Sequence, residues 1–513
     1  MKNSLNKVIL LGNLLAFLRS ETLHSQPIPL ISHKNNSLDS PLSLTPQETA
    51  LFWEGTPPSV IETYFSKLPL QLTSRVLRTM RDDLLKEKYY PLLQNTSYEQ
   101  TLFSLLRETG QIEKAKEFLL ESHLSDKETL LINVQWLEGK SKKVCEKISN
   151  LIRTSSDPEW KKQNIYCLIL NGEEERAKIA VELLSESPCP AHSLINALFD
   201  SSSLPLFDDA IARSPFLLTV WCAIGREIPE QSLKDIPPSS LALIANSENM
   251  LLKTRLLAAE RALQEGVVKG DAVFTLLKNA PTKDFLKNFS EALKASKTEI
   301  LLPLFQKATD EYKLGVIIDI FNAQLSKIEP SLPTLSLAPY MIRAFLERGE
   351  KAHAKKWGAF FMRESPDEAL SLFPLLHLAF PQNMWKNEQF EVWQAYQSRV
   401  HPQSAAQNSY LLRRVFEALG ETPRSVMKGE PAVPSWRQQK SFFDQKDMVL
   451  LESAADSKRK GEVFLLVLVM MGEEPFKSLS VDKLVPILKA LCKAGYKTEA
   501  RSLALEFLLA KDL

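Results

Sequence analysis

Four copies of one short spacing constrain the fold of this chain. Each copy has a bulky residue, a glycine four positions later, an alanine five positions after the glycine, and a basic residue next to that alanine. Glycine adopts the left-handed conformation that ends a helix without steric cost, and a small residue in the first turns of the next helix lets two backbones approach closely. The spacing therefore predicts four turns of helical hairpins, which are Leu106, Gly110 and Ala115; Leu168, Gly172 and Ala177; Phe345, Gly349 and Ala354; and Leu491, Gly495 and Ala500.

This spacing resembles the turn region of tetratricopeptide-type repeats, which are 34-residue helical hairpins stacked into a superhelix. The small residue that the family has twelve positions after the glycine is present in one copy, as Ser122, and the copies are irregularly spaced. The resemblance therefore implies an all-α chain built as an irregular, TPR-like α-solenoid of antiparallel helical hairpins. The start of the chain and the run from Arg459 to Leu513 also resemble exported bacterial helical-repeat proteins, a likeness that implies no activity.

The composition agrees with a soluble all-α protein. Apolar residues make up 44% and charged residues 24% of the chain, as in ordinary globular proteins. The 63 Lys and Arg residues against 62 Asp and Glu residues leave a net charge of +1, so no overall field favours nucleic acid or an anionic membrane. Many of the 16 glycines follow an apolar helical pattern, which leaves few for phosphate-binding loops.

Residues 1–25 have the pattern of a signal peptide. Lys2 and Lys7 precede an apolar run from Val8 to Leu18, and the small residue Ser25 follows. The run is shorter than the roughly 20 residues that cross a bilayer, so we expect no integral membrane span. We expect a periplasmic or secreted protein, and the alternative is a cytoplasmic one with a short N-terminal arm.

The five cysteines include no CxxC pair, and most are expected to be small buried hydrophobic residues. Export would permit one disulfide among Cys145, Cys167 and Cys189.

Breaks rich in proline and serine divide the remaining chain. The clearest helical periodicity runs from Tyr98 to Leu184, and nine consecutive apolar residues from Val463 to Met471 predict a helix that is buried on all sides. The expected segments are a linker at 26–46, an N-terminal helical-hairpin array at 47–187, a middle helical segment at 188–330, a third helical segment at 331–420, a Pro-rich loop at 421–436, and a C-terminal helical core at 437–513.

Sequence motifs for catalysis are absent. The chain has no HExxH, GxSxG, GxxxxGK[ST] or GxGxxG, and its seven histidines include no pair at a spacing of four. Adjacent acids such as Asp82 and Asp83 point about 100° apart on a helix, so they do not converge as an acid and base pair. We expect no catalytic residue, no cofactor, no metal site and no nucleic-acid partner.

Three tryptophans are candidates for contact with a partner. Trp385 and Trp393 are near each other in the sequence and would line a groove if they were exposed. Trp436 follows the Pro-rich loop and is the candidate for an exposed anchor.

The sequence therefore predicts a non-enzymatic scaffold that binds a protein or peptide partner, because stacked hairpins present an extended concave face. Two alternatives stay open. One is an enzyme with an (α/α)-type helical core that acts on a cell-wall or glycan substrate through residues far apart in the sequence. The other is a cytosolic adaptor.

Overall fold

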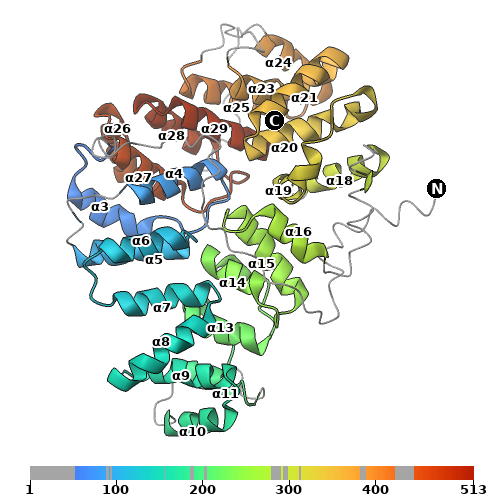
Figure 1. Cartoon of the computed structure of the whole chain (residues 1–513). Helices are drawn as coiled ribbons and strands as arrows, with labels where there is room; N and C mark the ends of the chain where they lie inside the picture. Colours follow the sequence, from blue (N-terminus) through green and yellow to red (C-terminus); the bar gives the residue numbers. More distant parts are fainter. Residues whose placement is uncertain are drawn as a thin grey trace. The chain divides into compact units, whose positions relative to one another are not determined.

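The computed structural model is helical throughout its described parts (Figure 1). It describes residues 52–87, 92, 95–155, 157–184, 190–200, 205–278, 291–292, 298–310, 314–381, 389–421 and 444–513. Across these ranges the regular elements are α-helices and short 3-10 helices, with no strand. The all-α class expected from the sequence is therefore confirmed.

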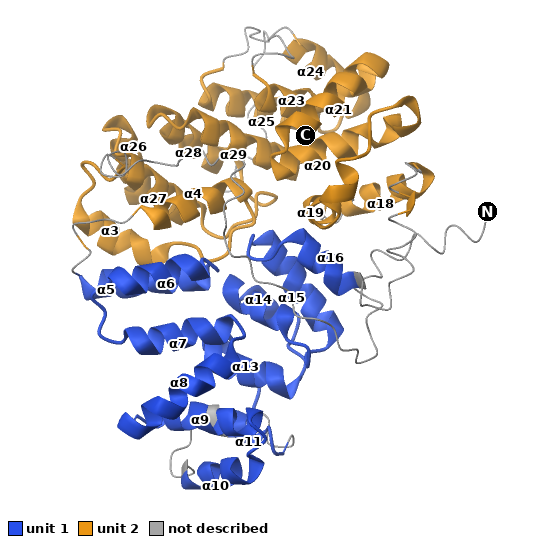
Figure 2. Cartoon of the chain, viewed as in Figure 1, with its two compact units in different colours: residues 1–36, 93–287 blue, residues 37–92, 288–513 orange. Residues whose placement is uncertain are grey.

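The chain forms two compact units (Figure 2). Unit 1 consists of residues 1–36 and 93–287, and unit 2 consists of residues 37–92 and 288–513. The boundaries differ from the segments expected from proline-rich breaks, because the helices before residue 92 belong to the same unit as the C-terminal half. A local break in composition carries no information about such long-range packing.

Unit 1 is built from short helices that begin and end where the sequence places glycine, serine, aspartate or proline. Its elements are α5 (Thr96–Glu108), α6 (Ile112–Glu121), α7 (Lys127–Leu137), α8 (Ser141–Thr154), α9 (Pro158–Leu170), α10 (Glu174–Leu184), α11 (Pro190–Asn196), α12 (Asp209–Arg213), α13 (Pro215–Ile224), η4 (Ser232–Lys234), α14 (Pro238–Asn246), α15 (Leu252–Gln264) and α16 (Gly270–Lys278).

The helices of unit 1 pack in two ways. From α5 to α11 each helix packs against the next one along the chain, as expected for consecutive hairpins. Helices α11, α13 and α14 then pack back against α9, α7 and α5. The aromatic rings of Trp136, Tyr166 and Phe216 meet at this contact, with centroids 5.7 to 6.1 Å apart. This return differs from a linear solenoid, in which each repeat contacts only its neighbours.

Unit 2 combines two N-terminal helices with the C-terminal half of the chain. Its elements are α3 (Pro58–Tyr64), η1 (Phe65–Lys67), α4 (Arg75–Lys86), α18 (Thr298–Asp310), α19 (Leu314–Leu325), η5 (Leu332–Leu337), α20 (Ala338–Arg348), α21 (Lys351–Glu364), α22 (Pro366–Ala369), η6 (Leu370–Leu372), α23 (Phe373–Ala379), α24 (Gln389–Val400), α25 (Ala405–Ala418), α26 (Gln445–Asp456), α27 (Lys460–Met471), α28 (Val481–Lys493) and α29 (Lys497–Ala510).

The core of unit 2 surrounds the apolar run expected to be a buried helix. That run is the helix α27, and its side chains from Val463 to Leu468 are fully buried. Helices α3 and α4 pack on α27, and α4 also packs on α29 (Figure 1). The two ends of the described chain therefore share one hydrophobic core.

The four glycines of the repeated spacing each end a helix in the left-handed conformation. Their φ angles are 85° at Gly110, 78° at Gly172, 81° at Gly349 and 96° at Gly495. In every copy the N–H after the glycine donates to the carbonyl of the bulky residue, a Schellman arrangement. These bonds measure 2.9 Å to Leu106, 2.9 Å to Leu168, 2.7 Å to Phe345 and 2.8 Å to Leu491.

The four alanines share one position as well. Each is the fourth residue of the second helix, and each is completely buried, as Ala115 in α6, Ala177 in α10, Ala354 in α21 and Ala500 in α29. The helix-turn-helix geometry is thus the same at all four copies.

Five further turns in the described ranges have this geometry without the spacing, at Gly139, Gly266, Gly420, Lys458 and Asp512. After α7, Gly139 has φ 68°, and the next N–H donates to the Gln135 carbonyl at 3.1 Å. After α26, Lys458 takes the glycine position with φ 55°, and the next N–H donates to the Ala454 carbonyl at 2.9 Å. The acceptor is a backbone carbonyl, so the side chain at that position is free to vary.

Candidate functional site

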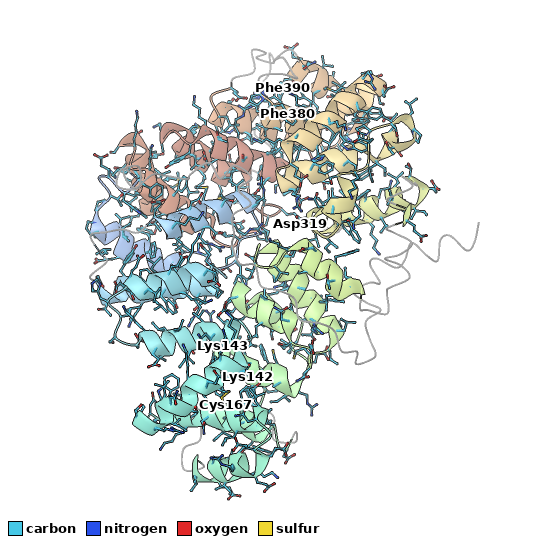
Figure 3. All side chains as sticks on the ribbon, viewed as in Figure 1. Lys142, Lys143, Cys167, Asp319, Phe380 and Phe390 are labelled. Atoms are coloured by element: carbon cyan, nitrogen blue, oxygen red, sulfur yellow. A yellow bond between two sulfur atoms is a disulfide. The ribbon has the colours of Figure 1, made fainter. Side chains whose placement is uncertain are left out.

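Charged side chains from α4, α19, the α20–α21 turn and α29 gather in unit 2. Figure 3 labels Asp319, which lies on α19. Contacts and mutual electrostatic effects connect the members of this arginine–carboxylate cluster, which we define as Arg75, Arg78, Asp319, Glu347, Arg348, Glu350, Lys351 and Glu506.

Glu506 connects α29 to the beginning of α4. Its carboxylate accepts hydrogen bonds from the Ser74 hydroxyl and from the Val76 N–H, the latter at 3.1 Å. The Ser74 oxygen in turn accepts the N–H of Leu77 at 3.0 Å. Free N–H groups in the first turn of a helix require such acceptors. Burial raises the pKa of Glu506, and these hydrogen bonds and the nearby Arg75 oppose that shift.

The Gly349 turn is the point where α20 and α21 meet this cluster. A side-chain carbon at Gly349 would lie 2.4 Å from both terminal nitrogens of Arg75, so a larger residue there would displace this guanidinium. Next to the turn, Arg348 pairs with Asp319 and places its Nε 2.7 Å from Glu350 Oε1. The turn therefore shapes the cluster as well as joining two helices.

Glu347 is a carboxyl of the cluster whose pKa is strongly raised. Burial raises its pKa to about 7, and the neighbouring charges of Asp319 and Glu506 add to this rise. The Gly315 N–H donates to the carboxyl, and a side-chain carbon at Gly315 would lie 2.5 Å from Glu347 Oε1. Glu347 is therefore present in both protonated and ionised forms at neutral pH, a property found often at functional sites.

Two cations of the cluster are open to solvent. The Arg75 side chain is 45% exposed, and its Nε lies 3.9 Å from Glu506 Oε1. Lys351 is exposed at the first position of α21 and forms no ion pair with any residue in the described ranges. Burial of part of its side chain, with the charges of Arg75 and Arg501, lowers the pKa of Lys351. These cations are accessible to an incoming anionic group.

A second polar group connects α23, α25 and α29. His377 Nε2 lies 3.0 Å from Glu421 Oε2, and Arg501 pairs with the other oxygen of that carboxylate. Arg501 Nη2 also donates to the His377 carbonyl at 3.2 Å. Burial and the charge of Arg501 lower the pKa of His377 to about 4, so its imidazole is neutral at pH 7. We interpret this group as a structural connection between helices.

Of the three tryptophans expected at a partner surface, the described residues include Trp393. Trp393 is completely buried and packs against Phe390 and Phe373, at centroid distances of 5.9 and 6.5 Å. Trp393 is therefore a core residue and lines no exposed groove. Trp385, Trp436 and the signal-peptide pattern at 1–25 lie outside the described residues.

Sequence reasoning did not find the arginine–carboxylate cluster, although Gly349 was recognised as a turn. Ser74 and Glu506, which are hydrogen bonded, lie 432 residues apart. No local motif connects residues at such separations. One local signal for these cations was present in the sequence. Arg75 and Lys351 are each the first residue of a helix, α4 and α21, where the positive end of the helix dipole disfavours a cation.

Of the cysteines in the described ranges, two form a disulfide and two, Cys222 and the half-buried Cys492, are free. Cys145 on α8 and Cys167 on α9 form a disulfide, and both residues are buried (Figure 3). Burial raises the pKa of the Cys222 thiol to about 12, so it is not a reactive thiolate. Cys189 lies outside the described residues.

In the described ranges, no three His, Cys, Asp or Glu side chains are arranged to hold a metal ion. Likewise, none of the described helices combines the length and the apolar character needed to cross a bilayer.

The fold and the cluster together define an all-α protein that carries a half-buried set of opposite charges. Comparison of the chain with family models, with curated proteins and with solved structures finds no match in any of the three.

Proposed function

We propose that this protein is a non-enzymatic helical scaffold that binds a protein or peptide partner at the arginine–carboxylate cluster. The observation that carries the proposal is the placement of Arg75 and Lys351, two exposed cations held by separate helices over half-buried carboxylates. Charges that are fixed before binding lower the entropic cost of association and favour one orientation of the partner.

The consecutive hairpins from α5 to α10 support a solenoid-like arrangement in that part of unit 1. We limit the TPR-like interpretation to these helices, because α11, α13 and α14 return against them. A concave face formed by a few hairpins is sufficient to hold an extended segment of a partner.

Export to the periplasm is part of the proposal. The Cys145–Cys167 disulfide supports it, because disulfides persist in oxidising compartments and are rare in the cytosol. Expression in bacteria with and without residues 1–25, followed by thiol labelling under denaturing conditions, tests this point. We expect these two cysteines to be blocked in the chain with residues 1–25 and free without them.

Binding at the cluster is tested by affinity purification from the native cell with a Lys351→Ala variant. Lys351 has no ion-pair partner in the described chain, so its loss leaves the fold intact. Lys489→Ala, an exposed lysine on α28, is the matched control. We expect one specific partner to be lost with Lys351→Ala and kept with Lys489→Ala. Equal recovery with both variants would refute binding at the cluster.

One observation favours a second candidate function. A carboxyl with a pKa of about 7 next to Asp319 is suited to act as a general acid with a carboxylate as its counterpart. Such a pair would fit an (α/α)-type enzyme acting on cell-wall glycans. Incubation with peptidoglycan and oligosaccharides decides between the two functions, because turnover that disappears in Glu347→Gln would establish the enzyme.

A further inference from the structure

The exposed face of α8 carries a concentration of positive charge. Its basic residues are Lys142, Lys143, Lys147 and Arg153, of which Lys147 is half-buried and the others are exposed. Figure 3 labels Lys142 and Lys143 on this helix. The single acid on the same helix is Glu146, which leaves a local charge of +3.

These four cations differ from several cations on other helices of unit 1. On α6, Lys116 pairs with both Glu113 and Glu138, and on α10, Lys178 pairs with Glu175. Within the described part of the chain, none of the four cations on α8 takes part in an ion pair. The fold therefore leaves an excess of uncompensated positive charge on α8, inside a chain whose net charge is close to zero.

The basic face is fixed in its orientation. Val144, Cys145 and Ile148 are buried on the opposite side of α8, and the disulfide from Cys145 holds the helix to α9. A helix held in this way cannot rotate to bring the cations to other partners. Its charges are preorganised for a ligand that approaches from solvent.

We propose that the basic face of α8 is a docking surface for an acidic polypeptide segment. The choice of a polypeptide as the ligand rests on the proposed function. The surface itself lies in unit 1, whereas the arginine–carboxylate cluster lies in unit 2. From Lys142 to Arg153 the helix rises about 16 Å, which an extended segment of about five residues spans. The partner segment would therefore carry two or three acidic side chains within that length.

Two other anionic partners fit this face less well. The sequence of α8 has no aromatic residue on which a nucleic-acid base would stack. Among the large apolar side chains that are exposed in the described structure, none is on α8, so the helix has no means of inserting into a bilayer.

The test is fluorescence anisotropy with the full chain and a labelled synthetic peptide of about 12 residues in which Glu and Ser alternate, at about 0.05 M and about 0.3 M salt. The variant is Lys142→Glu with Lys143→Glu. The matched control is Lys446→Glu with Lys489→Glu, which reverses two exposed lysines in unit 2. Single-stranded DNA of equal charge and vesicles containing phosphatidylglycerol serve as competitors.

We expect the wild-type chain and the unit 2 control to bind the peptide alike, and the α8 variant to bind it about tenfold or more weakly. Binding should also weaken at the higher salt concentration. No binding by the wild-type chain, equal loss in both variants, or preference for DNA or vesicles would overturn the proposal. Lys351→Ala should leave this affinity unchanged, so failure here is distinct from failure of the proposed function.

Discussion

Replacing Gly110 by alanine should destabilise unit 1 far more than the same change at Gly172. Both glycines end a helix with similar positive φ angles, 85° and 78°. A residue other than glycine costs about 1–2 kcal/mol there, and alanine regains about 0.4–1 kcal/mol through the unfolded chain. At Gly172 nothing lies within 4 Å of the added carbon, so a net loss of about 1 kcal/mol is expected.

At Gly110 the added carbon would also meet the Val267 side chain. Its distances to the two methyl groups would be 2.7 and 2.9 Å, far closer than carbon atoms pack. Overpacking of this kind costs about 1–3 kcal/mol. The expected total for Gly110→Ala is therefore about 2–4 kcal/mol.

Urea denaturation, followed by hydrogen exchange of peptides from unit 1, gives the free energy of unfolding of that unit for both variants. The difference between them isolates the Val267 contact, because the backbone term is common to both. Equal losses would show that Val267 does not approach the turn. A neutral or stabilising Gly172→Ala would show that the left-handed turn itself is wrong.

Three other changes have defined outcomes. Lys458→Gly should raise the free energy of unfolding by about 0.5–1 kcal/mol, because Lys458 adopts φ 55° in a glycine-like turn; a loss in urea denaturation would contradict this. The pKa of Glu347 rises from about 4.3 in the unfolded chain to about 7 in the folded chain. The stability contributed by its protonated form is therefore complete below about pH 4.3 and is lost as the pH rises through 7. Glu347→Gln should remove this dependence, worth about 4 kcal/mol, from unfolding measured between pH 4 and 8; an unchanged pH profile would contradict it. Replacing Cys145 and Cys167 together by serine should cost about 3 kcal/mol, since the disulfide closes a loop with a sequence separation of 22, and thermal unfolding that matches the oxidised wild type would contradict it.

The sequence predicted local structure well where the signal was local. The glycine turns, the buried alanines and the buried stretch Val463–Leu468 of α27 all depend on residues within a few turns of each other. The turns at Gly139 and Lys458 do not follow the spacing, because a backbone carbonyl and a positive φ do not require its bulky residue and alanine.

Long-range packing could not be predicted from the sequence. The pairing of α4 with α29 and the return of α13 against α7 depend on surfaces that are far apart along the chain. The arginine–carboxylate cluster arises from such contacts, so its members carry no common motif. The burial of Trp393 has the same origin, because the residues around it are not adjacent in sequence.

Site-specific photo-crosslinking in the native cell tests the central claim most directly. A photoreactive amino acid at position 351 lies at the proposed partner surface, and one at position 489 is an exposed control in the same unit. Binding at the cluster predicts one discrete crosslinked partner at position 351 and none at position 489. The same products at both positions, or no product at position 351, would contradict it.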